Sequence, residues 1–297
     1  MKKKILVIGG SSLLGYKILT NANNFELYSS YNKNLINHEN LETIKIDITN
    51  KKNCEKILKL NPDVIINTAA ITNVDYCEKY EKNAFDVNVN GVKNIAKIAQ
   101  KLGSKLIHIS SDAVFSGERK FYTEEDKPNP INIYGKTKLM GEKFVLNYPK
   151  NLVVRASVLY GLLPKKIQSL DTSSKKPMNF AQWLITKLGR HEAVNIITDE
   201  LSTPIIADDF ANSILHLISK DQIGLFHSAP NVQISRYDFS IKLANYLKLD
   251  TDLILPTTIQ NLGRNVQTAL NKCLSSDKLR STGFNFMTLN ESFNLLK

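Results

Sequence analysis

The stretch KILVIGGSSLLG, residues 4–15, decides the fold class of this 297-residue chain. Its first five residues are an apolar, largely β-branched run, which is typical of a buried parallel strand. Glycines follow, and a helical pattern begins at Tyr16, so the stretch predicts a strand, a glycine-rich turn and a helix. This context favours a dinucleotide site over a plain turn. Glycines let the backbone approach a pyrophosphate, and the helix N-terminus offers it free N–H groups.

Strand and helix patterns alternate through the first half of the chain. Apolar runs predict further strands at 25–31, 43–48, 64–67, 105–109 and 152–155, with helical patterns at 52–60 and 81–102. This alternation predicts an α/β fold, a doubly wound parallel sheet with helices on both faces. We expect the nucleotide-binding domain at 1–161 and a smaller C-terminal α/β substrate lobe at 162–297. About 193–218 should return to the first domain, and the Lys- and Ser-rich segment 163–177 should form a loop or lid.

Composition narrows the class of partner. The net charge is +11, from 39 Lys and Arg against 28 Asp and Glu, but the lysines are spread along the chain. That distribution argues against a nucleic-acid partner and fits either a solubility effect or an anionic small ligand. No run approaches the roughly 20 apolar residues of a membrane span. Cys54, Cys77 and Cys273 have no disulfide or metal spacing, so we expect a cytoplasmic protein without a metal site.

The end of the second predicted strand bears on the choice of cofactor. An acidic residue at this position would accept hydrogen bonds from the adenosine ribose hydroxyls and would repel a 2′-phosphate. The chain has Asn32 and Lys33 there instead, which favours NADP over NAD, although a solvated Lys33 is an equal alternative. Asp47, at the end of the third predicted strand, is either a contact to an adenine edge or a turn or cap residue.

Tyr134 and Lys138 lie four residues apart, one turn of a helix from each other. A nearby ammonium favours the phenolate and lowers the phenol pKa from its usual value of about 10. A surface pair that occurs by chance is the alternative. Ser111 ends the preceding predicted strand, and such strand ends share the ligand edge of the sheet with the following helix starts. The set suits hydride transfer from a nicotinamide to a carbonyl, with Tyr134 supplying the proton and Lys138 also holding the nicotinamide ribose.

Longer motifs then follow one another in order: PDVIINTAA at 62–70, TNVD at 72–75, HISSD at 108–112, VFSG at 114–117 and NPINIYGKTK at 129–138. In this order they resemble the extended short-chain dehydrogenase/reductases, and within them the dTDP-4-dehydrorhamnose reductase family. The resemblance implies a Rossmann-like fold and NADPH-dependent reduction of a nucleotide-linked 4-keto-6-deoxy sugar. It is compatible with a homodimer, for which no stretch of the sequence indicates an interface.

The resemblance also implies a set of site residues. The catalytic residues would be Ser111, Tyr134 and Lys138, with Asn88 supporting a proton relay. The substrate would contact Ser111, Asp112 and Val158. The cofactor would meet Gly9, Ser11, Ser12, Leu13, Leu14, Gly15, Asn32, Lys33, Asp47, Ile48, Ala69, Ala70, Ile71, Tyr134 and Lys138.

Three positions depart from the family pattern. Ser12 replaces the middle glycine of G-x-x-G-x-x-G, where its side chain either clashes with the pyrophosphate or hydrogen-bonds to it. Ala113 replaces a usual Tyr and Val158 a frequent Trp, both near the sugar. The same branch includes the regulatory β subunit of methionine adenosyltransferase, which shares the ISSDxVF and YGKTKLxGEK patterns. An NADP-binding regulatory subunit and a nucleotide-sugar epimerase are therefore open alternatives, and the sequence does not identify the sugar.

Overall fold

The structure is a computed structural model that describes residues 2–35, 41–164, 178–263 and 266–297. The segment 163–177, which the sequence predicts as a loop or lid, lies outside these residues except at its first two positions.

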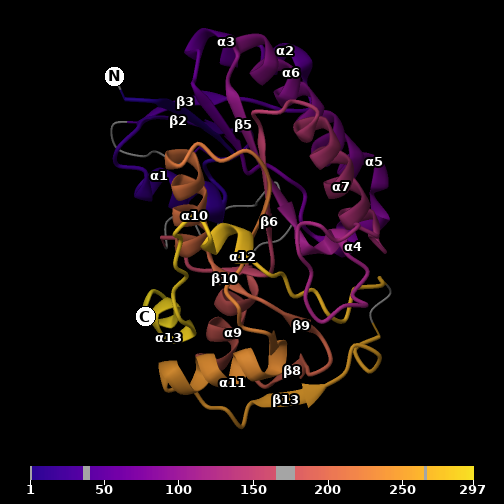
Figure 1. Ribbon diagram of the computed structural model, residues 1–297. Coiled ribbons are helices and arrows are strands. Elements are labelled where there is room, and N and C mark those ends of the chain that lie inside the picture. Colours follow the sequence, from indigo (N-terminus) through magenta and orange to yellow (C-terminus); the bar gives the residue numbers. More distant parts are fainter. Residues whose placement is uncertain (1, 36–40, 165–177, 264–265) are drawn as a thin grey trace.

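Seven parallel strands form the central sheet, in the order β11-β6-β5-β4-β1-β2-β3 (Figure 1). The chain passes outward from β1 to β3, then crosses back to β4 and continues in the other direction. This reversal between β1 and β4 is the switch point of a doubly wound fold, where such sheets bind ligands. The predicted fold class is confirmed. The strands are β1 Lys4–Ile8, β2 Glu26–Tyr31, β3 Glu42–Lys45, β4 Val64–Asn67, β5 Lys105–Ser111, β6 Leu152–Ala156 and β11 Gly224–Ser228.

Helices cover both faces of this sheet because successive strand residues point to opposite faces. Ile5 and Val7 of β1 pack into one buried cluster, and Leu6 and Ile8 pack into the other. The helices over the first face are α1 Leu13–Asn21 and α10 Ala207–Ser219. Those over the second are α2 Lys51–Cys54, α3 Ile57–Leu60, α6 Val92–Leu102 and α7 Ile133–Leu146 (Figure 1).

The predicted helix at 81–102 has an internal irregularity. It consists of α5 Glu81–Phe85, a π-helical turn η1 Asp86–Gly91, and α6. A π-turn holds one extra residue, and such turns are frequent at functional sites. The side chain of Asn88, within this turn, is fully buried.

Two boundaries differ from the sequence prediction. The third strand ends at Lys45 rather than at 48, because Asp47 accepts hydrogen bonds from Thr49 and turns the chain. The helical pattern at 52–60 divides into α2 and α3, and α3 ends at Asn61, whose φ of 45° is left-handed.

The C-terminal part packs around its own buried cluster, drawn in the lower half of Figure 1. Its β8 pairs with β13 rather than with the central sheet, whereas α10 packs on α1 and β11 joins the central sheet. The division of the chain at residue 161 stays a prediction. The elements of this part are β7 Leu159–Tyr160, α9 Phe180–Leu188, β8 Val194–Ile197, β9 Leu201–Ser202, β10 Ile205–Ile206, β12 Ile234–Ser235, α11 Arg236–Leu247, β13 Ile254–Thr257, α12 Asp277–Arg280 and α13 Leu289–Asn294.

Two short helices beside the sheet complete the description, α4 Val74–Lys79 and the 3-10 turn η2 Asp112–Val114. Across the described ranges, no helix combines the length and the apolar character that crossing a membrane requires.

Candidate active site

A cavity of about 660 Å³ lies at the carboxyl ends of the central strands. This cavity is lined by nearly all the residues that the sequence predicts for the site. The exceptions are Gly15 and Asn88. The residues therefore lie together, and their roles stay predictions. The predicted residues that line the cavity are Gly9, Ser11, Ser12, Leu13, Leu14, Asn32, Lys33, Asp47, Ile48, Ala69, Ala70, Ile71, Ser111, Asp112, Tyr134, Lys138 and Val158.

The glycine turn between β1 and α1 forms one end of the cavity. Gly9 has a φ of 81°, which a residue with a side chain rarely adopts. A Cβ atom at Gly15 would lie 2.3 Å from the Gly9 carbonyl oxygen, so α1 starts against this turn only because position 15 is glycine. Gly15 therefore shapes the turn from behind the cavity wall.

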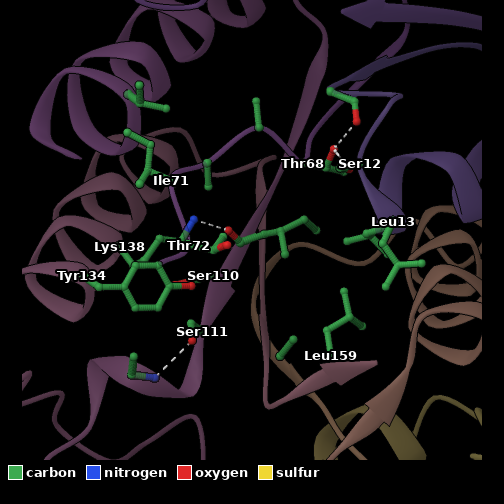
Figure 2. A pocket seen from close by; sticks show the side chains of 18 of the residues that line it. Ser12, Leu13, Thr68, Ile71, Thr72, Ser110, Ser111, Tyr134, Lys138 and Leu159 are labelled. Atoms are coloured by element: carbon green, nitrogen blue, oxygen red, sulfur yellow. Dashed lines mark hydrogen bonds between the residues drawn. The ribbon is translucent and has the colours of Figure 1, made fainter. Parts of the chain in front are cut away.

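Ser12 caps α1 through its side chain. Its Oγ accepts a hydrogen bond from the Gly15 N–H at 3.0 Å and lies 3.0 Å from Thr68 Oγ1 (Figure 2). The Thr68 hydroxyl donates to the Ile8 carbonyl at 2.8 Å, so the Ser12 proton is the one shared with Thr68. The hydroxyl that replaces the family's glycine thus links the turn after β1 to the end of β4.

The residues expected at the adenosine end follow β2 and β3. Asn32 is half-buried and Lys33 is exposed, and both line the cavity. Asp47 Oδ1 accepts the Thr49 N–H at 2.9 Å and the Thr49 hydroxyl at 2.7 Å. Asp47 is thus a turn residue whose side chain also lines the cavity, and its contact with an adenine edge stays a prediction.

The start of α7 brings Tyr134 to Ser111. Asn132 caps the helix by accepting the Gly135 N–H at 2.8 Å. A Cβ atom at Gly135 would lie 2.1 Å from the Ala113 carbonyl oxygen, so α7 presses directly on the turn that follows β5. In this position the side chains of Tyr134 and Ser111 both point into the cavity (Figure 2).

The pKa of Tyr134 moves opposite to the expected direction. Burial raises it, a hydrogen bond with Ser111 acts in the lowering direction, and the Asp112 carboxylate adds to the rise. The Lys138 side-chain nitrogen donates to the Ile109 carbonyl at 2.6 Å. Burial lowers the pKa of Lys138 itself to about 8. Burial thus disfavours the charged form of both groups, and a lowering of the Tyr134 pKa by Lys138 stays a prediction.

Asn88 lies behind the cavity wall, where its side chain holds the backbone. Its Oδ1 accepts the Ile71 N–H at 2.9 Å, and its Nδ2 donates to the Ile71 carbonyl at 3.0 Å and to Thr137 Oγ1 at 3.2 Å. Within the described residues, none of the hydrogen bonds of this side chain reaches Lys138. Its relay role stays a prediction.

Asp112 connects the end of β5 to the residue that follows β6. The side chain is buried, and its two oxygens accept the hydroxyl protons of Ser111 and Ser157, each at 2.9 Å. Burial raises the pKa of this carboxyl, and the charge of Lys272 opposes the rise. Val158 follows Ser157 and is half-buried in the cavity wall.

Two cations that the sequence did not single out, Arg236 and Lys272, also line the cavity. Both bind Glu200 Oε1, with Lys272 Nζ at 2.8 Å and Arg236 Nη2 at 3.0 Å. Glu200 is fully buried, and although burial acts in the raising direction, the two cations hold its pKa at about 2. These residues come from distant segments in which the motif resemblance is thin, so no local signal could have grouped them.

Cys54, Cys77 and Cys273 are buried, and none of them forms a disulfide. In the part of the chain that the structure describes, no group of three or more His, Cys, Asp or Glu side chains is placed to hold a metal ion.

Known proteins resemble the chain over nearly its whole length. A family model described as the RmlD substrate binding domain matches residues 2–294. The probable low-salt glycan biosynthesis reductase Agl14 of Haloferax volcanii is 33% identical over 233 residues, which cover 77% of this chain and 75% of that protein. Methionine adenosyltransferase 2 subunit beta of Rattus norvegicus is 30% identical over 265 residues, covering 86% and 75%.

A solved structure shares the fold closely. The crystal structure of dTDP-4-dehydrorhamnose reductase from Bacillus anthracis in complex with NADP has a TM-score of 0.86 and 28% sequence identity, and the match covers 99% of this chain and 98% of that one.

Proposed function

The chain belongs to the RmlD substrate binding domain family, and from this premise we propose that it is an NADPH-dependent reductase of a nucleotide-linked 4-keto-6-deoxy sugar. One observation carries the proposal. Ser111, Tyr134 and Lys138 converge on one cavity. A glycine turn forms one end of this cavity, and the positively charged side chains of Arg236 and Lys272 also line it. The relatives named as reductases and the NADP in the Bacillus anthracis structure support the same assignment.

The cavity wall suits a nicotinamide dinucleotide. The Gly9 turn and the N-terminus of α1 would hold the pyrophosphate, because backbone N–H groups there attract anions. Asn32 and Lys33 would hold the 2′-phosphate, and Lys138 the nicotinamide ribose. When bound, NADPH supplies the hydride.

The proposed role of Tyr134 is to donate a proton to the forming alkoxide. Burial raises the pKa of its hydroxyl, so the group stays a protonated phenol near neutral pH. Ser111, which points into the same cavity, would orient the substrate carbonyl toward the same proton. Lys138, with a pKa of about 8, can exchange protons near neutrality and would restore the proton of Tyr134.

The Arg236 and Lys272 pair supports a diphosphate-bearing substrate. Glu200 binds both cations and holds them in place. Two positive charges and one negative charge leave the group with a net positive charge. Thr268 Oγ1 is buried in the cavity wall and has no hydrogen-bond partner among the described residues, so it can serve the same anion. Asp112 and Val158 would lie beside the sugar.

The proposal is tested by following NADPH oxidation with a panel of nucleotide-linked 4-keto sugars, beginning with dTDP-4-dehydrorhamnose. We expect oxidation with at least one member and slower oxidation of NADH. Failure of every member to oxidise NADPH, in a preparation that binds NADP tightly, would overturn the reductase assignment.

A second candidate function is an NADP-binding regulatory subunit. The similarity to methionine adenosyltransferase 2 subunit beta favours it, because that likeness spans 86% of this chain. Tight NADP binding without turnover is its expected signature. Interconversion of nucleotide sugars without net NADPH consumption would instead indicate an epimerase. The cytoplasmic location and the homodimer stay predictions.

A further inference from the structure

We propose that His108 is a positioning residue that holds Lys138 ready to release its proton, by presenting an N–H group to the Lys138 side-chain nitrogen. This role rests on the proposed function, in which Lys138 restores the proton of Tyr134. It follows from a chain of four groups, the Ala69 backbone, Asn67, His108 and Lys138, whose two ends line the cavity.

The first link fixes the orientation of the Asn67 amide. Asn67 ends β4 and is buried, and its Oδ1 accepts the Ala69 N–H at 3.2 Å. A backbone N–H can only donate, so the atom that faces Ala69 must be the amide oxygen. The amide nitrogen Nδ2 therefore faces His108 Nδ1, at 3.3 Å.

The second link fixes the tautomer of His108. Because Asn67 Nδ2 donates, His108 Nδ1 must accept, and a neutral imidazole then carries its proton on Nε2. The neutral form is the relevant one, since complete burial together with the charge of Lys138 lowers the pKa of His108 well below its ordinary value.

The third link acts on Lys138. His108 Nε2 lies 3.4 Å from Lys138 Nζ, so the Nε2–H points at the lysine nitrogen. An ammonium group there would place two donors against each other. A neutral amine instead offers a lone pair to the Nε2–H and can still donate to the Ile109 carbonyl at 2.6 Å. The His108 N–H therefore stabilises the form of Lys138 that has released a proton.

Other charged groups near Lys138 act in both directions. Burial lowers the pKa of Lys138 to about 8, whereas Glu142 of α7 and Cys77 of α4 act to raise it. Glu142 is itself paired with Arg155, at 2.8 and 2.7 Å, and accepts the Ser110 hydroxyl at 2.5 Å. Tyr134 lies one helical turn before Lys138. The His108 N–H therefore acts in the same direction as burial and against Glu142 and Cys77.

The proton balance is simple. Once Tyr134 has donated its proton, an N–H bond of Lys138 breaks and the O–H bond of Tyr134 forms again. The phenolate and ammonium charges disappear together, and Lys138 becomes the amine that accepts the His108 N–H. Solvent then returns a proton to Lys138 for the next cycle.

The tautomer is tested directly by ¹⁵N NMR of the histidine rings. The chain has five histidines, and the His108 signals are those missing from the His108→Phe variant. We expect a protonated Nε2 and a bare Nδ1. A protonated Nδ1, or an imidazolium near neutral pH, would overturn the proposal.

The effect on Lys138 is tested by a pH titration of its ¹³Cε signal, assigned by its absence in Lys138→Met. We expect the midpoint to rise by about one pH unit in His108→Phe, because the opposing N–H is lost. A merely structural histidine would leave the midpoint unchanged, which would contradict the proposal. His216→Phe is the matched control, since His216 bonds to Thr282, far along the chain from the site, and should not shift Lys138.

A second variant, Asn67→Asp, tests the tautomer independently, so the test does not depend on the folding of His108→Phe. Asn67→Asp keeps the side-chain shape but makes both its outer atoms acceptors, so the His108 proton should move to Nδ1. An unchanged tautomer in Asn67→Asp would also overturn the proposal. None of these measurements needs turnover, so a failure of the reductase assay and a failure of the His108 role are distinguishable.

Discussion

The two ends of the cavity are built in different ways. At the expected nucleotide end, one continuous stretch from Gly9 to the first turn of α1 forms the glycine turn, mainly through its backbone. At the other end, Glu200, Arg236 and Lys272 arrive from separate segments and are joined by charge-assisted hydrogen bonds. The first end can therefore be recognised from a short sequence motif, whereas the second exists only after long-range folding. Variants that act on one end alone test this contrast.

The largest effect is expected where the two ends meet, at Tyr134. Tyr134→Phe should reduce turnover by about 10²–10⁴-fold, the usual contribution of a positioned proton donor, and leave NADPH affinity nearly unchanged. NADPH oxidation and a fluorescence titration of NADPH measure the two quantities. Tyr148→Phe, which alters a half-buried tyrosine after α7, is the control. Unchanged turnover in Tyr134→Phe would remove Tyr134 from the mechanism.

Glu200→Gln should affect the substrate end and the stability of the fold. It leaves Arg236 and Lys272 without their shared carboxylate, and breaking such a buried pair costs about 3 kcal/mol of unfolding free energy. The pKa of Glu200 is held at about 2, below its ordinary value of 4.5. The wild type should therefore exceed Glu200→Gln in unfolding free energy by the full amount above pH 4.5. This difference should shrink as the pH falls from 4.5 toward about 2.

Urea unfolding at near-neutral pH and at successively lower pH measures this difference, and NADPH affinity at neutral pH should not change. An advantage that stays constant through the acid range would show that the charge of Glu200 is not what stabilises the fold.

Lys33→Glu should act on the nucleotide end alone. A carboxylate there would repel the 2′-phosphate, so NADPH should bind about tenfold more weakly while NADH binds as before. Lys45→Glu, at the exposed end of β3, makes the same charge change outside the cavity and is the control. Equal weakening of both cofactors by Lys33→Glu would make Lys33 an ordinary surface residue.

The smallest effect is expected at Ser12. Ser12→Ala removes the cap of α1 and should lower the unfolding free energy by about 1 kcal/mol, whereas Ser12→Gly should cost only a few tenths. Urea unfolding of the two variants side by side measures this. Equal stability of Ser12→Ala and the wild type would mean that the Ser12 hydroxyl contributes little through Gly15 and Thr68.

The same contrast explains what the sequence could predict. The strand, turn and helix at residues 4–21 and the parallel sheet followed from local patterns and strand alternation. The meeting of Ser111 with Tyr134 followed because parallel strand ends share one edge. The direction of the Tyr134 pKa could not be predicted, because it depends on burial by packing that no motif encodes. The Glu200 pairs could not be predicted either, since their partners lie 36 and 72 residues further along the chain.

The π-turn at Asp86–Gly91 has a consequence for the length of this segment. A π-turn holds one residue more than the same stretch of α-helix, so deleting one residue from it would close the turn into a regular α-helix and leave the register of α6 unchanged. Ile95 and Ala99 would keep facing the sheet in the buried cluster. Asn88 would be the residue affected, because its contacts with the Ile71 backbone depend on its place in the turn. A single-residue deletion within 86–91 should therefore preserve the packing of α6 and change the cavity wall at Ile71.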